Sequence, residues 1–251
     1  MLKIDSQEVS VAHRGELRVV VAAVRPVGLG RVRAYLVADL LRRYAERSGL
    51  APTVVDFAPD NESGLRDACD ALNIHPPRHS LSRSEPTGDA RREQLASMFH
   101  DGVREPVFDI GVRLVLDDAI VDSAPVHDQA VDETLATRWI TLPLEPGEVK
   151  LGEEPLGVRL KLLGLGEDPV RTLGRWRAEV AMWARSPSGA MSRPHAAAIG
   201  AAFEDNLDSA TAVAVLLDLE DDDSVPDGVK FETFAAADRM FGLDLARDIG
   251  K

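Results

Sequence analysis

The segment that most constrains the fold is residues 17–49, where an apolar run precedes a glycine turn and a long amphipathic pattern. Residues 17–24 are rich in valine, which is typical of a strand in the middle of a parallel sheet. Apolar side chains then recur at helical spacing from Val32 to Tyr44, and Gly49 follows a basic last turn, as expected where a helix ends. The sequence therefore predicts a strand–turn–helix unit at the start of an α/β fold.

The predicted turn contains Gly28, Leu29, Gly30 and Arg31. Glycines at such a turn leave backbone N–H groups facing outward at the positive end of the helix dipole, which suits a phosphate or a carboxylate. A Gly-x-Gly pair alone is weak support, because the same turn also serves close packing of helix against strand. Arg31 is unfavourable to the dipole at a helix start. It therefore predicts an anionic partner, either a bound ligand or a nearby acidic side chain.

The rest of the chain predicts a sheet domain followed by helices. A second strand at 53–57 completes a βαβ unit, and further strands are expected at 108–116 and 138–142. Asp168 is a suitable N-cap before Pro169, and helical patterns follow to the end of the chain. The prediction is an α/β fold with a Rossmann-like parallel sheet and its helices over residues 1–165. A small C-terminal α-helical bundle is expected over 166–251.

Several segments, in order along the chain, resemble class I aminoacyl-tRNA synthetases, and cysteinyl-tRNA synthetase most closely. These segments are MLKI at the start, GELRVVVA before the turn, RAYLVADLLRRY with Asp39 in the family's register, ACDALNIHPP at 68–77, AAFEDNLDSATAVAVLLDL at 201–219 and FAAADRMFGLDL near the end. The resemblance implies a class I type of catalytic domain with a shortened insertion, a helical region like the family's stem, and no distal tRNA-binding region.

Both catalytic signatures of that family are altered here. The His-Ile-Gly-His signature falls on residues 28–31, so Gly28 and Arg31 replace its two histidines, which stabilise charge in the transition state. The Lys-Met-Ser-Lys-Ser signature falls near residues 150–154, where Lys150 is kept and Glu153 replaces the second lysine. A carboxylate facing a triphosphate is repulsive. The resemblance therefore implies a degenerate nucleotide site at Gly28, Leu29, Gly30, Arg31 and Lys150, with no catalytic residue.

The zinc site with which the family selects cysteine is also altered. Its first cysteine ligand aligns with Ala22, and its histidine and glutamate ligands align with Val126 and Ala130. Zinc needs about four Cys, His or carboxylate ligands, so no zinc is expected. His127 and Asp128 still match the middle of the family's motif. Candidates for a substrate pocket are therefore Ala22, His127 and Asp128.

Charge and the N-terminal sequence bound the partners and the location. The formal net charge is −13, partly concentrated in the run at 218–223, whereas proteins that grip tRNA usually present a basic surface. Stable tRNA binding is therefore not expected, although arginines cluster at 42–47 and 171–177. No apolar leader and no membrane-length apolar run are present, and the chain has a single cysteine. These features predict a cytoplasmic protein that does not enter a membrane.

These observations favour a synthetase-like paralogue that does not charge tRNA. In this hypothesis the old active-site cleft binds ATP, an adenylate, an amino-acid-like ligand or a protein partner. One alternative is an active ATP-dependent ligase that transfers an activated amino acid to another acceptor, with Arg31, Arg33 or Lys150 replacing the lost groups. The other alternative is a non-catalytic interaction protein, either a homodimer or a partner of a genuine synthetase.

Overall fold

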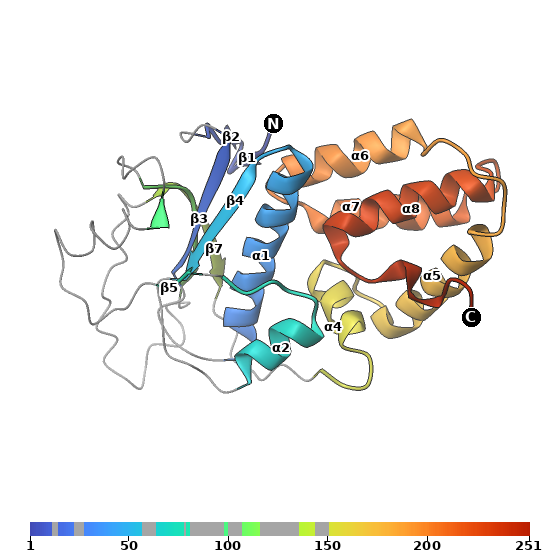
Figure 1. Ribbon diagram of the computed structural model, residues 1–251, viewed down its shortest axis with the longest axis horizontal. Helices are drawn as coiled ribbons and strands as arrows, with labels where there is room; N and C mark the ends of the chain where they lie inside the picture. Colours follow the sequence, from blue (N-terminus) through green and yellow to red (C-terminus); the bar gives the residue numbers. More distant parts are fainter. Residues whose placement is uncertain are drawn as a thin grey trace. The chain divides into compact units, whose positions relative to one another are not determined.

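The computed structural model describes residues 1–11, 15–22, 28–56, 64–77, 79–80, 98–99, 107–115, 136–143 and 151–251. The chain forms two compact units (Figure 1). The sheet unit comprises residues 9–69 and 74–150, and the helical unit comprises 1–8, 70–73 and 151–251. The helical unit thus joins the part of the chain from residue 151 on to two short earlier segments, whereas the sequence suggests a boundary at 165.

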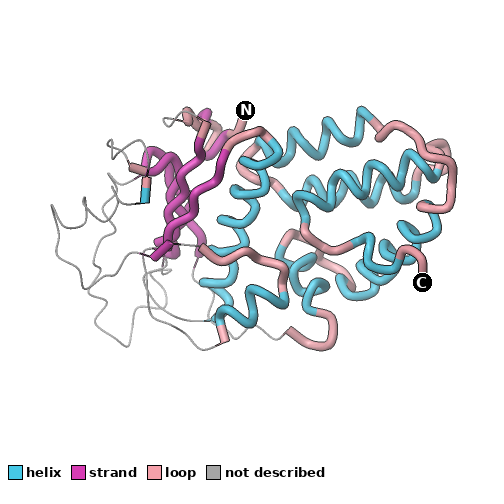
Figure 2. The backbone as a smooth tube through the Cα atoms, in the orientation of Figure 1, coloured by secondary structure: helices cyan, strands magenta, loops and turns pink. Residues whose placement is uncertain are grey.

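The sheet unit is built on five parallel strands (Figure 2). They are β3 (Glu16–Ala22), β4 (Ala51–Asp56), β5 (His79–Ser80), β6 (Phe108–Val115) and β7 (Ala136–Pro143). Their order is β5-β4-β3-β6-β7, so the chain adds two strands on one side of β3 and then two on the other. This order belongs to Rossmann-like sheets, and it places the topological switch point between β3 and β6. The predicted α/β, Rossmann-like sheet is confirmed.

Helix α1 (Gly28–Arg47) covers one face of this sheet. Its apolar side chains pack on fully buried residues of the central strand, such as Val19 and Val21. The helix ends before Gly49, whose φ of 73° only glycine adopts without strain. The predicted strand and helix end are therefore confirmed over the described residues.

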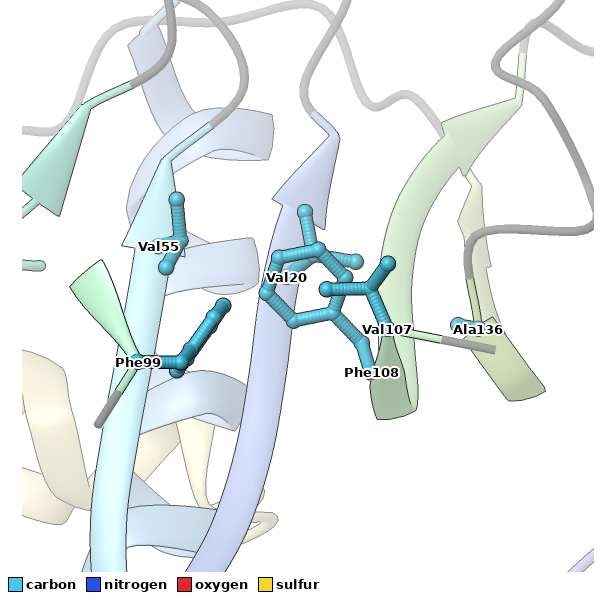
Figure 3. Close-up of a cluster of buried hydrophobic side chains, with 6 residues drawn as sticks. All are labelled: Val20, Val55, Phe99, Val107, Phe108 and Ala136. Carbon is cyan, nitrogen blue, oxygen red and sulfur yellow. The ribbon is translucent and has the colours of Figure 1, made fainter. Parts of the chain in front are cut away.

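The other face of the sheet has its own hydrophobic cluster (Figure 3). Phe99 meets Phe108 edge to face, with ring centroids 5.9 Å apart, and both side chains are buried. In Figure 3 these rings lie in front of β4, β3 and β6, with α1 behind the sheet. The remaining members of the cluster are Val20, Val55, Val107 and Ala136. Both faces of the central strands are therefore covered, as the valine-rich sequence of β3 requires.

The helical unit contains α4 (Pro155–Leu162), α5 (Pro169–Trp183), α6 (Arg193–Glu204), α7 (Ser209–Asp221) and α8 (Asp227–Phe241). Helix α5 begins as predicted, because the Asp168 side chain accepts a hydrogen bond from the Arg171 backbone N–H at 3.3 Å. Its apolar face meets α8 through Trp176 and Trp183, whose rings lie 5.5 and 5.2 Å from that of Phe234. None of the helices described here is long and apolar enough to cross a membrane.

The short elements were not predicted from the sequence. They are the hairpin of β1 (Lys3–Ile4) and β2 (Gln7–Glu8), helix α2 (Leu65–Ala71), helix α4 and the 3-10 helix η3 (Leu245–Asp248). Arg159 of α4 is fully buried and donates to the carbonyls of Leu72 and Asn73, each at 2.9 Å, and of Phe241 at 2.5 Å. This arginine joins three separate segments of the helical unit.

Candidate functional site

The candidate site lies at the carboxyl edge of the sheet, where β3 ends at Ala22 and α1 begins at Gly28. Open α/β sheets bind ligands outside the carboxyl ends of their strands at the switch point. Gly28, Leu29, Gly30 and Arg31 form the first turn of α1, whereas the sequence predicts a separate turn here with Arg31 at the start of the helix. The first turn of any helix leaves its N–H groups without intrahelical acceptors. Helix α1 begins earlier than the sequence predicts, and the N–H groups of its first turn are therefore still hydrogen-bond donors at this edge of the sheet.

Arg31 has an acidic partner within the protein. Its Nη2 lies 3.0 Å from Oδ2 of Asp56, the last residue of β4, and 3.3 Å from the hydroxyl of Tyr35. The Tyr35 hydroxyl also donates to the Asp56 carboxylate. Arg31 is 3% exposed and Asp56 is 5% exposed. The positive charge of Arg31 at the helix start is thus balanced by Asp56. The sequence left open whether the anionic partner of Arg31 is a ligand or an acidic side chain, and here it is an acidic side chain.

The electrostatics of this triad keep its charges fixed. Burial, followed by the nearby Asp56 carboxylate, raises the pKa of Tyr35, so its hydroxyl stays protonated and remains a donor. The pKa of Arg31 is also raised; burial opposes this shift, and Tyr35 and Asp56 outweigh it. Because both charges of the pair are buried together, the guanidinium is part of the packed core of the sheet unit.

A second arginine at this edge escaped the sequence analysis. Arg113 of β6 pairs in register with Ala22, at the last pairing between β3 and β6. Its Nε donates to the Thr141 hydroxyl at 3.1 Å, and its guanidinium carbon lies 5.6 Å from the centre of the Trp139 ring. Arg113 is only half-buried. The sequence gives one signal for this residue, because Arg113 is a charged residue within a run of alternating apolar residues. Strand alternation alone, however, predicts only an ordinary exposed side chain at this position.

Gly111 explains how Trp139 fits beside this arginine. The two residues are paired in register between β6 and β7. A Cβ built on Gly111 would lie 2.3 Å from Cε3 of the Trp139 indole, which real contacts do not allow. The indole therefore lies flat over the backbone at Gly111, and any larger residue would displace it.

The other predicted site residues fall in different places. Lys150, His127 and Asp128 lie outside the described residues. Ala22 is fully buried at the end of β3, and its side chain has no atom that could bind a metal. Glu153 is exposed, and the neighbouring Glu154 pairs with Arg177 at 2.9 Å inside the helical unit. Within the described ranges, no three His, Cys, Asp or Glu side chains are grouped to hold a metal ion.

The arginine clusters expected to form basic patches are largely paired with carboxylates. Arg42 and Arg43 both lie 2.8 Å from the buried Asp39 carboxylate, which also accepts from the His75 backbone N–H at 3.3 Å. In the helical unit, Arg175 binds both carboxylate oxygens of Glu220, at 2.6 and 2.8 Å. Each of these three arginines therefore has a carboxylate partner that offsets its charge.

No family model and no curated protein matches this chain. A proposal of function therefore rests on the sequence, on the fold and on the carboxyl edge of the sheet.

Proposed function

We propose that the sheet unit binds a small nucleotide or aminoacyl-adenylate-like ligand at the carboxyl edge, and that the protein does not charge tRNA. In this proposal the chain is a synthetase-like paralogue of the cysteinyl type. Its helices α5–α8 correspond to the stem region of that family. The old active site is kept as a binding crevice that lacks the groups needed for adenylate chemistry.

The observation that carries the proposal is the strand order, which brings the start of α1 and the switch point to the same edge. The backbone N–H groups of the first turn suit an anionic group, and the space outside β3 and β6 is where ligands of such sheets bind. This support is independent of the side chains that the chain has lost. It favours binding at this edge over a purely structural role for the Gly28–Gly30 turn.

The state of Arg31 supports the absence of catalysis. An activating enzyme needs groups that stabilise charge on the phosphate in the transition state more than in the ground state. Arg31 is buried against Asp56, and Gly28 offers no side chain, so neither is placed to act as the signature histidines do. The alternative of an active ligase would require a different cation to take this role.

Two assays on the full chain test the proposal. ATP–pyrophosphate exchange with each of the twenty amino acids should give no signal above background. Titration calorimetry with AMP, ATP and aminoacyl-sulfamoyl adenylates should give saturable binding of at least one of them. Robust exchange with any amino acid would favour the active-ligase alternative and reject the proposal. Failure of the whole panel to bind would reject the ligand-binding crevice and favour the interaction-protein alternative.

A further inference from the structure

We propose that a second copy of this chain docks on the exposed face of helix α5, with the two α5 helices antiparallel about a two-fold axis. This face belongs to the helical unit, so the inference goes beyond the proposed function and needs no ligand at the sheet.

Helix α5 has one packed face and one exposed face. The side chains of the packed face are buried, and they are Leu173, Trp176, Val180 and Trp183. The exposed face has an apolar or small residue at every fourth position, namely Val170, Gly174, Ala178 and Met182. Val170 is 50% exposed and Met182 is 56% exposed. Residues four apart follow one row along a helix, so these four form a continuous strip about 18 Å long. Scattered exposed apolar residues are ordinary, whereas a continuous strip indicates an interaction surface.

The sizes of the side chains along this strip suit a crossing helix. A Cβ built on Gly174 meets nothing within 4 Å, and Ala178 lies one turn further along the exposed face. Two crossing helices are closest at the crossing point and diverge on either side of it. Small residues therefore fit the centre of such a contact. The larger Val170 and Met182 fill the widening space at its two ends.

The order of the residues in the strip is symmetric about position 176. Gly174 and Ala178 lie at equal distances from that position, and so do Val170 and Met182. In an antiparallel pair that crosses there, each residue meets the residue at the equal distance on the other copy. Small residues thus meet small ones, and large apolar residues meet large ones. The strip is complementary to itself, which is what a two-fold contact between identical chains requires.

The charges beyond the two ends of the strip follow the same symmetry. Glu167 and Arg185 are both exposed, and they too are equally distant from position 176. The antiparallel pair places Glu167 of each copy opposite Arg185 of the other copy. A parallel pair would place like charges side by side, which is unfavourable. Charge complementarity therefore favours a second copy as the partner, in the antiparallel orientation.

The size of this surface sets the strength of the contact. One helix face is smaller than the roughly 800 Å² per partner of a standard interface. Two chains that each carry a net charge of −13 also repel each other until salt screens them. We therefore expect a reversible dimer with a dissociation constant of about 10–100 μM at about 150 mM salt.

Sedimentation velocity of the full chain from about 5 to 500 μM measures the association. Ala178→Glu places a charge at the centre of the strip. Its matched control is Ala197→Glu at an exposed position of α6, which changes the net charge equally. Glutamate is a good helix former, so both variants should fold, and circular dichroism verifies this. We expect the wild type and Ala197→Glu to dimerise alike, and Ala178→Glu to associate about ten-fold more weakly or less.

An exchange of charges tests the antiparallel orientation. Glu167→Arg and Arg185→Glu each place like charges opposite one another, so each alone should weaken the dimer about five-fold. The double variant has the net charge of the wild type and should recover its affinity. A wild type that stays monomeric at the highest concentration would overturn the proposal, as would a dimer that Ala178→Glu leaves intact. A double variant that associates no better than the single ones would reject the two-fold pairing of α5.

Discussion

At the scale of single residues, the pair of Arg31 and Asp56 ties the start of α1 to the end of β4. Removing two charges from water is costly, and the attraction between them repays that cost only with good geometry and further hydrogen bonds. Tyr35 supplies such a bond to the carboxylate. The pair therefore fixes where the helix begins relative to the carboxyl edge, and it depends on all three side chains being present.

Asp56→Asn should destabilise the protein strongly, because it removes the buried negative charge that faces the Arg31 guanidinium. We expect a loss of about 3 kcal/mol in the free energy of unfolding, measured by urea denaturation. Tyr35→Phe removes only a hydroxyl and should cost about 1 kcal/mol. Equal effects of the two substitutions would contradict the ion pair as the main interaction.

Glu179 of α5 is a half-buried carboxylate with a defined electrostatic setting. Burial, followed by the nearby Glu220 of α7, raises the pKa of Glu179 to about 7. Glu220 is itself bound by Arg175 and by the Trp176 indole N–H at 2.9 Å, so its charge is well supported. Arg175 and Lys230 oppose the shift at Glu179 only in part. Glu179 therefore keeps its proton to a higher pH than an ordinary glutamate does.

This arrangement predicts that stability falls as the pH rises. A carboxyl group whose pKa is raised on folding stabilises the protein at low pH, and that contribution is lost between its unfolded value near 4.5 and about 7. Glu179→Gln keeps the shape and cannot ionise. It should raise the free energy of unfolding at pH 8 by about 1 kcal/mol, allowing for partial solvent screening, and change it little at pH 5. A parallel pH profile for variant and wild type would disprove the raised pKa.

At the scale of elements, the sequence predicts those whose pattern is long and self-consistent. The strand of valines and the long helix after it agree in period, turn residues and end signals, and both form. The hairpin of β1 and β2 and the helices α2 and α4 are too short to show a period. Contacts distant in sequence hold some of them, such as those from Arg159 to residues 72–73.

The candidate site, like the elements, could be predicted only in part from the sequence. The position of Arg31 at a helix start indicated an anion, but its partner Asp56 lies 25 residues further along the chain, so sequence alone could not choose between ligand and side chain. Arg113 and Trp139 belong to different strands, and only the parallel register between β6 and β7 brings them together. The register between two parallel strands is seen in the folded sheet, and the pattern within each strand alone does not reveal which residues are paired.

Gly111→Ala tests the packing between these two strands. The added methyl group would overlap the Trp139 ring at 2.3 Å, so the indole must leave its place. We expect a loss of about 2 kcal/mol in stability and a shifted tryptophan emission spectrum. The control is Gly174→Ala on α5, where the same methyl group meets open space and should stabilise the helix by about 0.5–1 kcal/mol. Neutral behaviour at Gly111 would show that the indole does not lie over this residue.

At the scale of the whole molecule, charge is the property that bears most on partners. The chain has a net charge of −13, and arginines that would form basic patches are bound to Asp39, Glu154 and Glu220. Affinity for nucleic acid comes mainly from positive side chains that displace counterions from phosphates. An arginine that is already bound to a carboxylate contributes little to this release of counterions. From the net charge and from these pairs among the described residues, we predict that the protein does not bind tRNA stably.

Fluorescence anisotropy with labelled tRNA measures this directly. We expect dissociation constants weaker than about 10 μM at 150 mM KCl, with little dependence on salt, because few counterions are released. The triple substitution Asp218→Lys, Asp221→Lys and Asp223→Lys replaces three exposed carboxylates near the end of α7 with cations. It should tighten binding and steepen the salt dependence, since lysines also suit the negative end of the helix dipole. Submicromolar binding by the wild type with a steep salt dependence would contradict this prediction. It would mean that a surface of arginines on the folded protein binds tRNA despite the negative net charge.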